Sequence, residues 1–170
     1  MAVQDWVGRW QLDPDRTEVA FRSPTFWGLA KVKGRFPDVE GSGEATAPNL
    51  ISGRLEIHAA SVDTGNRKRD DHLRSADFFD VEEHPVVEVT VSSAGLTDAD
   101  RVNLHVQVTV KGVPHMLDLP VRVTTLDDGA LRLEASTPVS RRDLGVDGNL
   151  LGMMGDTTRV EATAVFVKQS

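Results

Sequence analysis

Apolar and polar residues alternate with a period of two along most of the chain, as in β-strands that bury one face. The clearest case is VNLHVQVTV, in which Val102, Leu104, Val106, Val108 and Val110 share one face. The same alternation marks residues 19–21, 27–36, 55–59, 87–91, 117–123, 131–135 and 160–166. Because helical segments do not alternate with these strands, the pattern predicts an all-β fold with antiparallel pairing.

About eight such segments follow one another at near-regular spacing, with glycines where strands would bend. This arrangement predicts a closed antiparallel barrel, and its 170 residues suit a single domain spanning residues 1–170. Ala59, Ala135, Ala162 and Ala164 fall at inward positions. Small inward residues leave room for a slender ligand, or they alternate with large ones to fill a tapering barrel, and both interpretations stay open.

The alternation breaks between Thr64 and Phe79, where NRKRDDHLRS has helical spacing. We predict a short helical insertion near residues 66–80, with Asn66 as its N-cap. Phe78 and Phe79 would anchor this insertion to the core. Placed over one end of the barrel, it would act as a lid.

The polar residues of the insertion allow three interpretations. An Asp beside a His, here Asp70 and His72, can act as a general base with its orienting partner, or contribute to a metal site. Alternatively, charge-assisted bonds between Arg69 and Asp70 satisfy buried groups under the lid. Because catalytic and metal-binding motifs are missing from the sequence, we expect no catalytic residue and no metal site. The expected structural polar network is Asp63, Arg69, Asp70 and His72.

The remaining titratable residues and the composition exclude several functions. We expect His58, His84, His105 and His115 on outward strand positions or in turns. The net charge of −7 argues against nucleic-acid binding, and the lack of cysteine excludes disulfides and thiolate chemistry. No window approaches the roughly 20 apolar residues of a membrane-spanning helix, so stable membrane insertion is not expected. MAVQDWVGRW lacks the features of a secretory signal, which predicts a cytoplasmic location.

Four blocks occur in order along the chain: WQLDPDRTEVAF, VDTGNRKRDDHLRSADFFDVEEHP, VTVKGVPHMLDLPV and SRRDLGV. Together they resemble the YceI-like family of lipocalin-like, polyisoprenoid-binding proteins, and the second block is the specific one. The resemblance implies an eight-stranded antiparallel lipocalin-like barrel whose elongated channel holds a long isoprenoid chain, without a reaction or a cofactor other than bound lipid. Two places depart from the family pattern. Arg16 and Thr17 replace a His-Ser pair, and Leu144 replaces a Phe near the channel mouth.

Pattern and resemblance together predict a protein that is not an enzyme. Its expected function is binding, storage or transport of a long-chain isoprenoid or quinone-like lipid. Each buried CH₂ contributes about 0.8 kcal/mol, so an apolar wall needs little polar machinery to hold such a chain. The expected ligand-binding residues are Phe21, Phe36, Leu55, Ile57, Phe78, Phe79, Val89, Leu104, Val106, Leu119, Val121, Leu133, Leu144, Met153, Met154 and Phe166.

Alternative functions remain at this point. Met153 and Met154, in GNLLGMMGD, would form an adaptable apolar loop at a barrel end or plug the core. The protein could instead be a hydrolase or isomerase that uses Asp70 and His72. A third alternative is an interaction module with a filled barrel. A symmetric homodimer is expected, through a sheet edge or through exposed apolar groups near Trp6 and Trp27.

Overall fold

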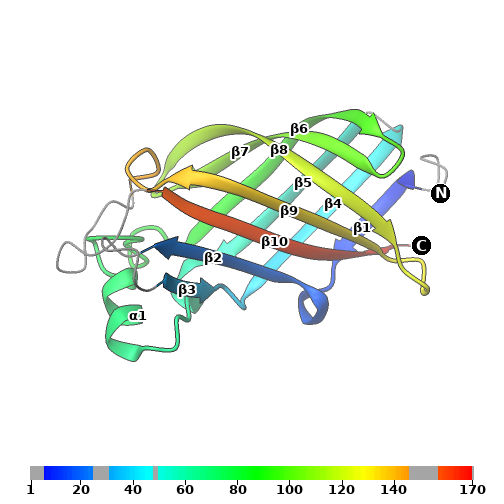
Figure 1. Ribbon diagram of the computed structural model, residues 1–170. Coiled ribbons are helices and arrows are strands. Elements are labelled where there is room, and N and C mark those ends of the chain that lie inside the picture. Colours follow the sequence, from blue (N-terminus) through cyan, green and yellow to red (C-terminus); the bar gives the residue numbers. More distant parts are fainter. Residues whose placement is uncertain (1–5, 25–30, 48–49, 146–156, 170) are drawn as a thin grey trace.

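The computed structural model describes residues 6–24, 31–47, 50–145 and 157–169. These residues form one antiparallel sheet, one α-helix and two short 3₁₀ helices (Figure 1). The strands are β1 (Gly8–Leu12), β2 (Glu18–Pro24), β3 (Lys31–Arg35), β4 (Val39–Ala47), β5 (Leu50–His58), β6 (Val86–Asp98), β7 (Arg101–Val110), β8 (Val113–Thr125), β9 (Leu131–Ser140) and β10 (Thr157–Lys168). The helices are η2 (Pro14–Arg16), η3 (Ala59–Ser61) and α1 (Arg67–Arg74).

Eight of these strands close into a ring. They follow the order β1-β4-β5-β6-β7-β8-β9-β10, and β10 pairs back onto β1. Every pairing in the ring is antiparallel, which confirms the predicted eight-stranded antiparallel barrel. The two further strands extend the sheet at one end, since β2 pairs with the other half of β10 and β3 pairs with β2.

The seam of the barrel lies where β10 changes partner. Its residues Phe166–Lys168 pair with β1, and its residues Arg159–Thr163 pair with β2. Between β1 and β2 the chain turns through η2. At this point the hydroxyl of Thr17, and not a backbone carbonyl, accepts the hydrogen bond from β10. The Val165 amide donates to Thr17 Oγ1 at 3.1 Å, and Thr17 Oγ1 donates to the Asp13 carbonyl at 2.7 Å. The Asp13 amide completes the seam by donating to the Val165 carbonyl at 2.8 Å.

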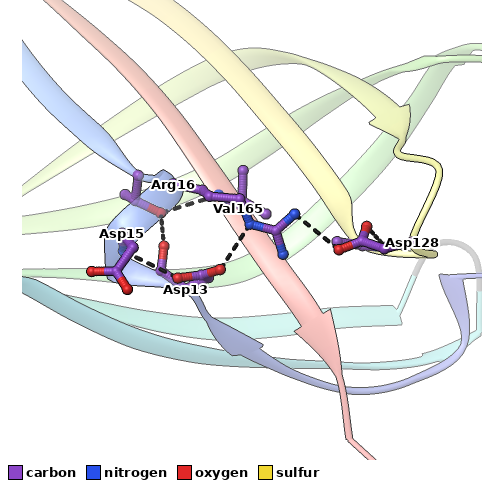
Figure 2. A network of polar contacts seen from close by, with 7 residues as sticks. Asp13, Asp15, Arg16, Asp128 and Val165 are labelled. Carbon is purple, nitrogen blue, oxygen red and sulfur yellow. Dashed lines mark hydrogen bonds and ion pairs between the residues drawn. The ribbon is translucent and has the colours of Figure 1, made fainter.

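Arg16 ties this turn to the opposite hairpin, across β10 (Figure 2). Its guanidinium donates to Asp13 Oδ2 at 2.8 Å and to Asp128 Oδ2 at 2.9 Å, in the turn between β8 and β9. The Ala130 amide and, secondarily, Arg16 lower the pKa of Asp128. Arg16 and Thr17, the two departures from the family pattern in the opening block, therefore both have structural partners here.

The insertion packs against the end of the barrel where β3 begins, and the β8–β9 turn lies at the other end (Figure 1). Its helix is shorter than expected: α1 ends at Arg74, and turns follow it. Asn66 caps α1 as predicted, since its side chain accepts from the Arg69 amide at 3.0 Å. Leu73 and Phe78 are almost fully buried, so the insertion covers this barrel end as a lid. Within the described residues, the structure has no helix of the length and apolarity that crossing a bilayer requires.

We predict that Thr17→Val destabilises the fold by about 1–3 kcal/mol, because the Val165 amide loses its partner at the seam and the Asp13 carbonyl loses one of its two donors. Urea unfolding measures the change. Thr46→Val is the matched control, since Thr46 is exposed and its hydroxyl reaches only the Leu50 carbonyl at 3.4 Å. Equal stability of the two variants would contradict a structural role for the Thr17 hydroxyl.

Candidate ligand-binding channel

Two cavities, of about 190 and 220 Å³, lie inside the barrel. We call the first the Trp chamber, after Trp6 and Trp10 in its wall, and the second the lid chamber, after Phe78 and Phe79 of the insertion. Each is smaller than a typical ligand pocket of about 300–1,000 Å³, but together they fall within that range. Residues shared by both walls are Leu55, Val89, Val106, Leu119, Ala135 and Ala162. The cavities therefore adjoin along a common stretch of wall, which we call the waist.

At the waist, two alanines lie side by side in register. Ala135 of β9 is the cross-strand partner of Ala162 of β10. On the opposite side of the ring, Leu55 of β5 pairs with Val89 of β6. Because an alanine side chain ends at Cβ, the β9–β10 side contributes little volume at this level. The filled-barrel alternative therefore does not fit the described interior, and the small inward residues leave space for a ligand.

The Trp chamber has an apolar inner face that includes two buried tryptophans. Trp6 and Trp10 are 3% and 7% exposed, and the Trp10 indole donates to the Trp6 carbonyl at 2.8 Å. Gly43 lies opposite both Trp10 and Gly53, which leaves room beside the indole. The expectation that Trp6 forms an exposed dimer surface is wrong, because its side chain packs inside the barrel. Trp27 lies outside the described residues.

The lid chamber is bounded by aromatic rings from the strands and the insertion. Phe36 lies between Phe21 and Phe79, with ring centroids 5.6 and 5.5 Å apart. Gly34 of β3 is the cross-strand partner of Phe21, and its lack of a side chain allows the Phe21 ring to lie over β3. A Cβ at Gly34 would stand 2.3 Å from that ring. Leu73 and Phe78 close the chamber from the insertion. This end is thus shaped by residues far apart in the sequence.

Fourteen of the predicted ligand-binding residues line one or both chambers. Lid-chamber members are Phe21, Phe36, Ile57, Phe78, Phe79 and Leu144; Trp-chamber members are Leu104, Val121, Leu133 and Phe166; waist members are Leu55, Val89, Val106 and Leu119. Met153 and Met154 lie outside the described residues. Contact of these residues with a ligand stays a prediction.

The predicted ligand-binding set omitted part of the wall. The alternation had already placed Val102 and Val123 on inward faces, although the set left them out, and Trp10 could have been found from the same period. Ser23 and Thr158 also line the lid chamber, where an apolar pattern gives no signal for them. Ser23 shares a face with Phe21, so strict alternation alone would have placed it inward.

The polar network of the insertion is organised differently from the prediction. Asp70, 7% exposed, accepts hydrogen bonds from the amide and the hydroxyl of Thr64. Arg69 donates to Thr64 Oγ1 at 2.8 Å and to the Thr64 carbonyl at 2.9 Å. Thr64 therefore connects the two charged residues, where a direct bond between Arg69 and Asp70 was expected. These contacts fix the loop that leads into α1.

Asp63 and His72 belong to separate contacts. Asp63 pairs with Arg35 through both backbone groups, which docks the loop onto β3. The His72 ring contacts Phe78 edge-on, and its Nε2 lies 2.9 Å from Asp77 Oδ2. The catalytic alternative required an Asp70–His72 pair, and the structure gives the two side chains different partners. Positions two apart on a helix do not face each other, which is the physical reason.

The other histidines include one exception to the expected outward placement. His115 of β8 shares the face of Leu117 and Leu119, and its Nε2 is buried without a hydrogen-bond partner among the described residues. His58 lies outward on β5, and its Nε2 is 2.8 Å from Glu40 Oε1. This hydrogen bond is the main cause that raises the pKa of His58, and nearby Asp38 and Glu56 add to the shift.

His58, Glu40 and Glu56 also form the set of potential metal ligands that the described residues bring together. Their ligand atoms lie within 4.8 Å of one another on the outer face of the barrel. Arg54 already pairs with Glu56 at 2.7 Å. The set lies outside the channel, and we assign it no role in the candidate site.

A closed antiparallel barrel around apolar cavities is typical of a class of small-molecule-binding proteins. A family model, the YceI-like domain, matches residues 10–166. The chain therefore belongs to the YceI-like family, as its sequence blocks indicated.

Several known proteins are similar to this chain. A UPF0312 protein of Azotobacter vinelandii is 27% identical over 130 residues, covering 72% of this chain and 68% of the relative. Protein YceI of Escherichia coli O157:H7 is 28% identical with the same coverage. BcnA of Burkholderia cenocepacia superimposes with a TM-score of 0.82 at 18% identity, over 91% of this chain and 98% of the other. A polyisoprenoid binding domain from Saccharophagus degradans gives 0.81 at 19% identity, over 94% and 98%.

We predict that Gly34→Ala destabilises the protein by about 1–3 kcal/mol, because the new methyl group must displace the Phe21 ring into the lid chamber. Gly95→Ala is the control, since a Cβ at Gly95 meets nothing within 4 Å. Urea unfolding of both variants measures the difference. If Gly34→Ala is as stable as Gly95→Ala, the ring does not lie over this strand.

The raised pKa of His58 predicts a pH dependence of stability. Protonated His58 favours the folded state, so this stabilisation is complete below the unfolded pKa of about 6.5 and is lost as pH rises through the folded value. His58→Gln should therefore lose stability relative to wild type at pH 5.5 and not at pH 8.5. The difference should stay near 0.2–1 kcal/mol because the pair is partly exposed.

Glu40→Gln is the partner control for this experiment, because it removes the main cause of the shift. It should reduce the same pH-dependent difference, and added salt should reduce it further. Parallel stability profiles of wild type and His58→Gln between pH 5.5 and 8.5 would show that the contact contributes nothing.

Proposed function

We propose that this protein binds a long-chain polyisoprenoid, or a similar single-chain amphiphile, and holds it for storage or transport. The observation that carries this proposal is the pair of apolar chambers that adjoin at a waist lined by two alanines. A slender chain can pass such a waist, whereas a wide rigid ring system cannot. The name of the Saccharophagus degradans relative, a polyisoprenoid binding domain, supports the same ligand class.

The energetics favour a long ligand. Each buried CH₂ contributes about 0.8 kcal/mol, whereas association costs about 4–15 kcal/mol in lost freedom. A short chain in one chamber barely offsets this cost, and a chain that fills both chambers exceeds it. The apolar wall also leaves few polar groups to desolvate on binding. Chain length therefore contributes more to the affinity than any single contact does.

The proposal has two finer parts. One variant of the ligand carries a quinone-like head group. The protein also forms a symmetric homodimer; because Trp6 lies inside the barrel, the dimer would have to use another surface, and sedimentation measures the oligomeric state. The proposed function requires no catalytic residue. The distinct partners of Asp70 and His72 support a binding protein over a hydrolase or isomerase.

We predict that Ala162→Phe blocks the waist and lowers the affinity for C20 or longer prenyl alcohols by more than tenfold. A C10 alcohol, which fits in one chamber, should keep its affinity. Titration followed by the fluorescence of Trp6 and Trp10 measures binding, because both indoles line the Trp chamber.

Thr163→Phe is the matched control, since it adds the same ring to the neighbouring position on β10, which faces away from the channel. It should bind both alcohols like wild type. Undiminished C20 binding by folded Ala162→Phe would exclude a chain threaded through the waist. Failure of wild type to bind any prenyl chain would reject the proposed function as a whole.

A further inference from the structure

Buried polar side chains gather on one side of the lid chamber. The buried polar or charged residues of the described chain are Ser23, Asp70, Arg141 and Thr158. Asp70 serves the loop before α1, and the other three line the lid chamber. Ser23 is fully buried, Thr158 is 6% exposed and Arg141 is 8% exposed. Thr137, in the same wall, adds a third hydroxyl.

These groups come from three neighbouring strands, β2, β10 and β9. Val160 of β10 pairs with Phe21 of β2 and with Thr137 of β9, which places Thr137 in the row beside Phe21. One step toward the lid, Ser23 and Thr158 join their hydroxyls at 2.5 Å. Arg141 follows directly after β9. We call Ser23, Thr137, Arg141 and Thr158 the polar corner.

The hydroxyl pair has donor capacity to spare. Each hydroxyl carries one O–H donor, and a pair uses only one of the two protons. The second proton remains able to donate to an acceptor in the chamber. Valine and alanine at these two positions would line the chamber without any polar group that needs a partner. Arg141 adds a positively charged guanidinium to the same wall.

The Trp chamber provides a contrast. Its inward side chains, among them Trp10, Leu104, Val121 and Leu133, are apolar. The Trp10 indole N–H is already satisfied by the Trp6 carbonyl. Ser42 and Arg54, which border this chamber, are exposed residues at the alternate, outward positions of β4 and β5. The channel therefore has an apolar end and an end rich in hydrogen-bond donors.

We propose that the polar corner binds the oxygen-bearing head group of the amphiphile, while the chain passes the waist and ends in the Trp chamber. This inference rests on the proposed function and adds an orientation and a head-group class. Because hydroxyl and guanidinium groups donate, the matching head is rich in acceptor oxygens, as in a carboxylate or a phosphate.

The test compares two probes of equal length, a C20 isoprenoid carboxylic acid and the corresponding C20 hydrocarbon. Wild type should bind the acid at least tenfold more tightly. The double variant Ser23→Ala/Thr158→Val should lose about tenfold in affinity for the acid and nothing for the hydrocarbon. Removing both partners of the hydroxyl pair leaves no unpaired group, so the fold should be retained. Thr163→Val, an outward hydroxyl on β10, is the control.

The outcomes separate the two proposals. Equal wild-type binding of acid and hydrocarbon, or equal weakening of both by the double variant, overturns the polar corner and leaves the channel intact. If wild type binds neither probe, the proposed function fails as well. Thr137→Val provides a second, single-site test in case the double variant does not fold, with the same expected selective loss. A C20 phosphate in place of the acid distinguishes the two anionic heads.

Discussion

The structure depends on how much side-chain volume its inward positions supply at mid-height. An eight-stranded barrel is just wide enough to be filled by its own side chains. Here the aromatic residues gather toward the two ends, in one buried cluster with Phe21, Phe36 and Phe78 and another with Trp6 and Trp10. Between them, the Ala135–Ala162 pair supplies two methyl groups. Burial at the ends stabilises the fold, and the small alanine side chains leave the middle with little side-chain volume on its β9–β10 side.

Local contacts maintain this geometry where the chain departs from regular strand structure. At the seam, Thr17 replaces a backbone partner of Val165, so β10 can change from β1 to β2 without an unpaired amide. At the lid, Thr64 connects Arg69 and Asp70 and fixes the start of α1. Both contacts use a threonine hydroxyl that donates and accepts at once. The polar groups of the lid therefore serve the architecture of the channel end.

Much of the fold could be predicted from the sequence, because period-two alternation directly encodes which residues face inward. It placed fourteen predicted ligand-binding residues on the chamber walls. The helix was also predicted, since Asn66 and the change of period mark its start. The end of the helix at Arg74 was not predicted, because the turn residues that follow it also pack against the core, as far as Phe78 and Phe79.

Two of the errors share one cause: side-chain direction and contacts in irregular segments depend on tertiary structure. Trp6 precedes β1, and nothing in its neighbours shows that it folds into the barrel. Thr64 was not expected between Arg69 and Asp70, since hydrogen bonds of a loop hydroxyl have no sequence period. His115 was expected outward or in a turn, whereas its register with Val108 places it on the inward face of β8. The polar corner, too, is visible only once three strands are assembled.

The central claim is that a single chain occupies both chambers through the waist. Intermolecular nuclear Overhauser effects between a bound C20 prenyl chain and the methyl groups of Ala135 and Ala162 test it most directly. The account predicts contacts from ligand protons to both alanine methyl groups and, from the far end of the chain, to the Trp10 indole. Contacts confined to one chamber, or to outward residues such as Thr163, would contradict it.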